Sequence, residues 1–172
     1  MKQWYEEDTL LFDMEKAEMG QRFPEARLEQ LSDGRYYWIL EFPLIVSPVS
    51  PPDCVRKWKI MMVYDSDFTP FVKQRKGYTR TIRIYPLSPN MKDMEEMYRI
   101  HKGCYPPHIL VDEFANKYLC VDYDNGKSDR VARAADVAAD TIKWLTAFEL
   151  SLIYNDIFEK FKINDTASSS RE

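Results

Sequence analysis

The stretch "RFPEARLEQLSDGRYYWILEFPL", residues 22–44, predicts the end of a helix and the first two strands of a sheet. Pro24 disfavours helical geometry at Phe23, so a helix that reaches Arg22 ends there. Beyond the proline, "ARLEQL" and "YYWILEF" carry the alternating, aromatic and β-branched residues of strands. The residues "SDGR" between them are typical of a turn. We therefore expect a helix followed directly by paired strands.

The flanking segments extend this pattern in both directions. Upstream, residues 8–22 have the spacing of an amphipathic helix that Asp8 or Thr9 can cap. The residues expected on its apolar face are Leu10, Met14 and Ala17, with Leu11 beside them. Downstream, "WKIMMVY" and "TRTIRIYP" predict two further strands, with a turn at "SPVSPPD". Because no helix intervenes to make parallel crossovers, the fold class is α+β, an antiparallel meander with a helix on one face.

The second half of the chain predicts an irregular region and then a long helix. The irregular, proline-bounded region covers residues 87–108 and contains a short helix from Met91 to Ile100. The long helix starts near Ser128 and runs through "FEKF". Its apolar face is expected to carry Ile142, Leu145, Phe148 and Leu152, with Trp144 and Ile153 beside it. We expect one domain over residues 1–163 and a disordered polar tail over residues 164–172.

Composition narrows the class of protein. The chain is 45% hydrophobic and 30% charged, which is typical of a globular domain. A net charge of −4 gives no support to a nucleic-acid or anionic-membrane partner. The N-terminus does not have the pattern of a secretory signal, and no segment approaches the roughly 20 apolar residues of a membrane span. The three widely spaced cysteines predict reduced thiols, and so a cytoplasmic protein.

Common catalytic motifs are missing from the sequence. The five glycines form no phosphate-binding loop, and there is no G-x-S-x-G hydrolase motif. One zinc-like set exists, in which His101, Cys104 and His108 are spaced at three and four and Cys120 could add a fourth ligand. The glycine and prolines of "KGCYPPH" oppose the helix that would align these ligands. We therefore expect neither a metal nor a cofactor.

Cys120 is the cysteine with the most informative surroundings, "PPHILVDEFANKYLCVDYDNG", residues 106–126. It is either a small buried hydrophobe in a strand or a nucleophile. Carboxylates at Asp122 and Asp124 would raise the pKa of a thiol, which argues against a protease-like thiolate. The same carboxylates would suit thioester exchange, because they can help to deprotonate an incoming lysine amine. They fit an ordinary turn equally well.

The order of elements, the pairs Pro107-His108 and Leu119-Cys120, and the run "DTIKWLTAFE" at 140–149 together carry a family resemblance. The chain resembles the bacterial ubiquitin-conjugating-enzyme-like proteins of antiphage CBASS operons, which are encoded beside cGAS/DncV-like nucleotidyltransferases. The resemblance covers roughly residues 9–160 and implies a ubiquitin-conjugating-like fold. It also implies that Cys120 is a catalytic nucleophile that forms a thioester with a protein C-terminus.

The resemblance implies roles for other residues too. His108 would donate to a developing oxyanion or hold the loop, and Asp112 with Asn116 would position the loop or the oxyanion. The alternatives are a histidine of the core or surface, and an ordinary turn. Trp144 is expected to fill the space between helix and sheet. Two further expectations concern Glu149, which should accept a backbone hydrogen bond, and Cys104, which is the competing nucleophile.

The expected activity is that of a thioester-forming acyl transferase in bacterial antiviral defence. The protein it carries would be the operon's nucleotidyltransferase, with the carboxyl group activated elsewhere, because the sequence holds no recognisable nucleotide-binding unit. Two alternatives stay open. One is a non-catalytic scaffold of the same fold that binds a partner protein, and the other is a conjugating enzyme for a bacterial ubiquitin-like protein. Neither nucleic acid nor a membrane is expected as a partner.

Overall fold

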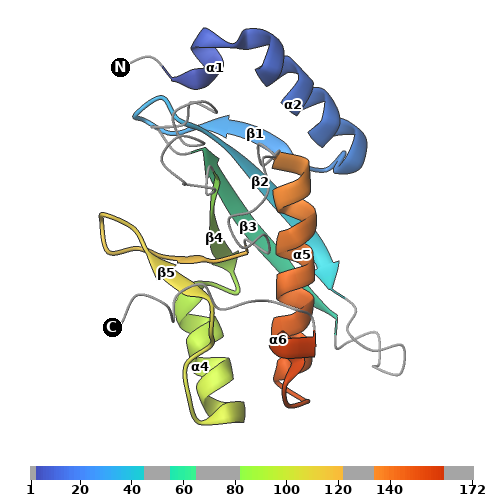
Figure 1. Ribbon diagram of the computed structural model, residues 1–172, viewed down its shortest axis with the longest axis vertical. Coiled ribbons are helices and arrows are strands. Elements are labelled where there is room, and N and C mark those ends of the chain that lie inside the picture. Colours follow the sequence, from blue (N-terminus) through green and yellow to red (C-terminus); the bar gives the residue numbers. More distant parts are fainter. Residues whose placement is uncertain (1–2, 45–54, 65–81, 122–133, 161–172) are drawn as a thin grey trace.

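The computed structural model of the chain describes residues 3–44, 55–64, 82–121 and 134–160 (Figure 1). Several sequence-based predictions fall outside these residues. They concern the turn at 47–53, the first residues of the strand at 79–81, the acidic pair Asp122 and Asp124, the start of the long helix at 128–133, and the tail at 164–172. Cys54 also lies outside the described residues.

Six strands form one antiparallel sheet in the order β1-β2-β3-β4-β6-β5. The strands are β1 (Arg27–Gln30), β2 (Tyr36–Leu44), β3 (Arg56–Tyr64), β4 (Ile82–Ser88), β5 (Ile109–Val111) and β6 (Lys117–Leu119). The first four are the predicted meander, so the α+β class and the antiparallel sheet are confirmed. The β5–β6 hairpin was not predicted, because strands of three residues are too short to show alternation.

The helices lie at the two ends of the sheet and across one face of it (Figure 1). They are α1 (Trp4–Glu7), α2 (Thr9–Arg22), α4 (Met91–Lys102), α5 (Ala134–Ser151) and α6 (Ile157–Lys160). Helix α2 has the predicted boundaries. The Asp8 side chain accepts a hydrogen bond from the Leu11 N–H at 3.0 Å, and the Phe23 N–H donates to the Met19 carbonyl at 2.7 Å. Within the described residues, no helix has the length and apolar character needed to span a membrane.

The predicted apolar face of α2 is wrong. Leu10 is 72% exposed, and Met14 and Ala17 are exposed with it. The buried residues of the helix are Phe12, Glu15 and Met19. A carboxylate is buried on this face because Glu15 accepts hydrogen bonds at Oε2 from the Tyr64 hydroxyl at 3.0 Å and from the Ala134 N–H at 2.9 Å. Glu15, a residue type that ordinarily faces solvent, therefore joins α2 to the sheet and to α5.

The core lies between α5 and one face of the sheet. Alternate residues of the central strands point into it, including Trp38, Leu40, Trp58, Ile60, Met62 and Ile84. On α5, the predicted Trp144, Leu145 and Phe148 are fully buried and Ile142 is only partly buried, as is Leu152 just after the helix. Ile153 is exposed, contrary to expectation, because α5 ends at Ser151 and the chain turns, with Asp156 at φ 59°, before α6 begins.

Glu149 joins α5 to β3 through side-chain donors rather than the backbone donor expected from the sequence. Its Oε1 accepts from the Trp58 Nε1–H at 3.0 Å and from Arg56 Nη1 at 3.1 Å. Burial raises the pKa of Glu149, and the charge of Arg56 and the hydrogen bond from Trp58 partly offset that rise. The contact satisfies the indole N–H of a tryptophan that is almost completely buried.

Helix α4 replaces most of the region that the sequence presented as irregular. Its N-terminus is a capping box, in which the Asn90 side chain accepts from the Asp93 N–H and the Asp93 side chain accepts from the Asn90 N–H. Its C-terminus is Gly103 at φ 71°, a left-handed conformation that favours glycine. The helix therefore extends two residues beyond the predicted end at Ile100.

Candidate functional site

The structure brings Cys120 and His108 together across the open end of the β5–β6 hairpin. Cys120 directly follows β6, and its N–H donates to the His108 carbonyl at 2.8 Å. The preceding residue, Leu119, is paired with Ile109 in β5 and with Ile84 in β4. The cysteine is thus held by main-chain hydrogen bonds at the point where the hairpin meets the meander.

His108 is held in an unusual backbone conformation. Its φ of 60° is in the left-handed region, which costs a residue with a Cβ about 1 kcal/mol or more. The imidazole is largely buried and packs on the Phe158 ring of α6, with 5.5 Å between ring centroids. Strained residues gather at functional sites, where the surrounding structure holds them. The ring contact with α6 supports the loop-holding role more directly than oxyanion donation.

The Cys120 side chain is only 5% exposed, whereas Cys104, directly after Gly103 at the end of α4, is exposed. A thiol reacts as its thiolate and must be reached by the other reactant. Cys120 therefore has the better-defined position and Cys104 the better access. Reaction at Cys120 would require its side chain to become more exposed.

Trp144 lies in the aromatic layer that supports His108. Its ring stacks on Phe148 with a centroid distance of 5.9 Å and contacts Phe158 at 5.4 Å. This agrees with the expected packing role. Its buried Nε1–H has no hydrogen-bond acceptor among the described residues. A buried donor without an acceptor costs about 1–3 kcal/mol. The Phe158 ring contacts both this indole and the imidazole of His108.

Asp112 lies away from Cys120, at the closed end of the hairpin, because β5 and β6 separate the two. Its carboxylate organises the turn by accepting from the N–H groups of Phe114 at 2.9 Å and Asn116 at 2.8 Å, and from the Tyr85 hydroxyl at 2.9 Å. Although burial raises the pKa of Asp112, the hydrogen bonds from Asn116 and Tyr85 lower it overall. Asp112 and Asn116 thus form an ordered turn. Any influence on Cys120 passes through the hairpin.

The described residues contain no group of three histidine, cysteine or acidic side chains arranged to hold a metal ion. His101 lies in the last turn of α4 and Cys104 follows the helix. His108, by contrast, has its ring against α6. His101, Cys104 and His108 therefore form no such group within the described part of the chain.

A cavity of about 670 Å³, not anticipated from the sequence, lies beside the hairpin turn. It is lined by side chains from β3 and β4, by the start of α4, and by the turn that contains Asp112. The only signal in the sequence is the cationic and aromatic residues at outward positions of "TIRIYP", where Arg83 and Tyr85 alternate with core isoleucines.

Similarity to known proteins assigns no role to the Cys120 and His108 segment or to the cavity. No family model, no curated protein and no solved structure matches this chain.

Proposed function

We propose that the chain is a ubiquitin-conjugating-like protein whose Cys120 forms a thioester with the C-terminus of another protein. The observation that carries this proposal is the main-chain hydrogen bond from Cys120 to His108, with His108 in a left-handed conformation. It makes the Pro-His and Leu-Cys pairs, which carry the family resemblance, neighbours in space. The order helix, meander, cysteine, helix supports a ubiquitin-conjugating-like fold.

The chemistry is an exchange of thioesters. The Cys120 thiolate attacks the carbonyl carbon of an incoming acyl thioester, a new C–S bond forms, and the donor's thiolate leaves and takes up a proton. An amine that has lost its proton then attacks the Cys120 thioester, an amide forms, and the Cys120 thiol is released. Both steps exchange one acyl bond for another, so neither needs an oxidant or a metal.

The carried protein in this proposal is a cGAS/DncV-like nucleotidyltransferase, as the family resemblance implies, and the role is antiviral defence. A bacterial ubiquitin-like protein is the alternative cargo. A cytoplasmic setting, expected from the widely spaced cysteines, belongs to the same proposal. The hydrogen bond between Cys120 and His108 supports the same chemistry for either cargo.

A second candidate function is a non-catalytic scaffold of the same fold. The burial of Cys120 favours it, because a thiol that is 5% exposed behaves as a small core hydrophobe until it is uncovered. In that case the left-handed His108 and the aromatic layer beneath it are packing features, and the partner binds without a covalent bond.

The test is to incubate the purified protein with ATP and the proteins encoded by its neighbouring genes. The products are separated on denaturing gels with and without thiol. A thiol-sensitive adduct that is lost in Cys120→Ala and retained in the matched control Cys104→Ala supports the enzyme. The scaffold prevails if Cys120→Ala forms the full complex and no thiol-sensitive adduct appears with the unsubstituted protein.

A further inference from the structure

The cavity beside the hairpin turn faces away from the core. Met61 and Arg83 line it, and they alternate along β3 and β4 with the core residues Met62 and Ile84. Because successive side chains of a strand point to opposite faces, the cavity lies on the sheet face opposite α5. Its volume of about 670 Å³ is within the usual range for small-molecule sites.

The lining of this cavity is positively charged in a chain whose net charge is −4. Among the described residues, four cationic side chains line it against two carboxylates: Arg35, Arg83, Lys92 and Lys117 against Glu95 and Asp112. Both carboxylates already have partners. Glu95 pairs with Lys117, and Asp112 accepts the hydrogen bonds of its own turn and of Tyr85. With Lys117 and Glu95 neutralising each other, the cations Arg35, Arg83 and Lys92 outnumber the carboxylate of Asp112 in the described lining.

Two of these cations are guanidinium groups, Arg35 in the β1–β2 turn and Arg83 on β4. The hydrogen bond that Arg35 donates to Asp33 raises the pKa of Arg35, while burial and the positive charge of Arg83 lower it. The charge of Arg83 is thus felt at Arg35, and like charges repel. Their carboxylate partners, Asp33 and Glu113, do not line the cavity and are about half exposed, whereas the arginine side chains are only 19% and 18% exposed. A ligand anion placed between the arginines would relieve the repulsion.

Arg35 still has a donor to offer. Asp33 Oδ2 lies 2.8 Å from Arg35 Nε and 2.7 Å from Nη2, and no partner for Nη1 occurs among the described residues. Lys92, in the first turn of α4, is exposed and has no ion-pair partner among the described residues. The N-terminus of α4, which is the positive end of its helix dipole, lies at the cavity, because Asn90 and Met91 also line it.

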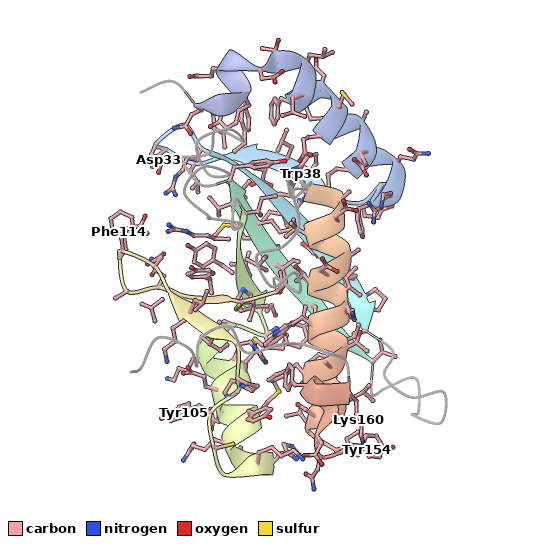
Figure 2. All side chains as sticks on the ribbon, viewed as in Figure 1. Asp33, Trp38, Tyr105, Phe114, Tyr154 and Lys160 are labelled. Atoms are coloured by element: carbon pink, nitrogen blue, oxygen red, sulfur yellow. The ribbon has the colours of Figure 1, made fainter. Side chains whose placement is uncertain are left out.

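Much of the rest of the lining is apolar. Leu31, Met61, Val63 and Leu87 contribute to it, and Phe114 is 71% exposed at the hairpin tip. Figure 2 shows Phe114 projecting from the tip on the same side of the molecule as Asp33. An exposed aromatic ring beside a cationic cavity matches a ligand that has both an apolar body and an anionic group.

We propose that this cavity binds a small organic anion whose phosphate or carboxylate lies between Arg35 and Arg83 and whose apolar body packs against Met61 and Phe114. The site lies beside the closed end of the hairpin, whereas Cys120 follows its open end, and it does not depend on thioester chemistry. Lys92 adds a peripheral positive charge. The ligand is recognised by its charge and its apolar group together.

Three probes of similar size test this proposal: phenyl phosphate, benzoate and the neutral benzyl alcohol. Each is titrated into the isotope-labelled full chain while amide chemical shifts and the dissociation constant are measured. We expect phenyl phosphate or benzoate to bind with shifts centred on Met91, Lys92 and Phe114. Preference for one of them identifies a phosphate or a carboxylate ligand, and benzyl alcohol should bind more weakly than either. Equal binding of benzyl alcohol, or shifts centred on α2, would overturn the proposal.

Substitutions provide the second part of the test. Arg35→Gln and Arg83→Gln should each weaken binding of the preferred anion by about tenfold or more, because each removes a charge-assisted hydrogen bond. Lys92→Gln, at an exposed position that leaves the fold intact, should weaken it by about threefold. Arg27→Gln is the matched control, since it removes an exposed arginine from β1, outside the cavity lining. An equal loss in Arg27→Gln, or no loss in Lys92→Gln and Arg83→Gln, contradicts the proposed site.

Discussion

Glu149 accepts the indole N–H of Trp58 at 3.0 Å, so one carboxylate joins the main helix to the centre of the sheet. Glu149→Ala leaves that buried donor unpaired, and we expect it to lower the free energy of unfolding by about 1–3 kcal/mol. Glu149→Gln keeps an acceptor and should lose less. Urea denaturation of the two variants measures the difference. Equal losses would show that the charge of Glu149, rather than its acceptor oxygen, stabilises the contact.

The same carboxyl group should make stability depend on pH. Its pKa is raised by burial from an ordinary value of 4.5, so near that pH the folded state binds more protons than the unfolded state. Its contribution to stability therefore falls as pH rises through the folded-state pKa. Unfolding free energies from about pH 4 to pH 7 should decline for the unsubstituted protein relative to Glu149→Gln. A relative increase over that range would reverse the assigned direction.

Two methionines on α2 test which face of the helix is buried. Met19 is completely buried, so Met19→Ala should cost about 2–5 kcal/mol of unfolding free energy. Met14 is exposed on the same helix, and Met14→Ala should change stability by less than about 0.5 kcal/mol. Thermal or urea unfolding of this matched pair distinguishes the observed face from the one the sequence suggested. Similar costs at the two positions would contradict the structure.

Asp112 should act on the hairpin rather than on the reacting atoms. Asp112→Ala removes the acceptor for Asn116, Phe114 and Tyr85, and we expect it to lower unfolding free energy by about 1–2 kcal/mol. Glu96→Ala, an exposed change on α4, is the control for surface charge. Adduct formation at Cys120 should persist in folded Asp112→Ala, as gels run with and without thiol will show. Loss of the adduct with unchanged stability would instead assign Asp112 a direct role.

Access to the two described cysteines should differ measurably. In a Cys54→Ala background, a thiol reagent such as iodoacetamide should modify the exposed Cys104 at least about tenfold faster than the buried Cys120. Mass spectrometry of the peptides gives both rates. A rise in the Cys120 rate when the partner protein is added would show that binding uncovers the thiol, as the enzymatic proposal requires. Fast labelling of free Cys120 would contradict its burial.

The sequence predicted the elements better than it predicted their faces. Pro24 and the turn residues after it determine where α2 ends and the meander begins, and these signals are local. The buried face of α2 was misassigned because Glu15 is buried through a hydrogen bond to Tyr64, a residue 49 positions away. No periodicity within the helix reports a partner on a distant strand.

The candidate site was predictable only in part, for a similar reason. The Pro-His and Leu-Cys pairs identify the segment, but the hairpin that makes Cys120 and His108 neighbours has strands of three residues. The cationic cavity was missed because its lining comes from the β1–β2 turn, β3, β4, α4 and the hairpin turn. Each contributes one or a few residues, and their convergence is a property of the tertiary structure.

The strand order β4-β6-β5 attaches the hairpin to the meander through one of its two strands. Among the described residues, β6 meets the meander at the single registered pair of Leu119 with Ile84, and β5 lies at the edge of the sheet. Cys120 directly follows the paired Leu119, while Phe114 lies in the turn at the other end of the hairpin. The hairpin thus presents its turn to the cavity and its open end to the cysteine, so one small element contributes to both candidate sites.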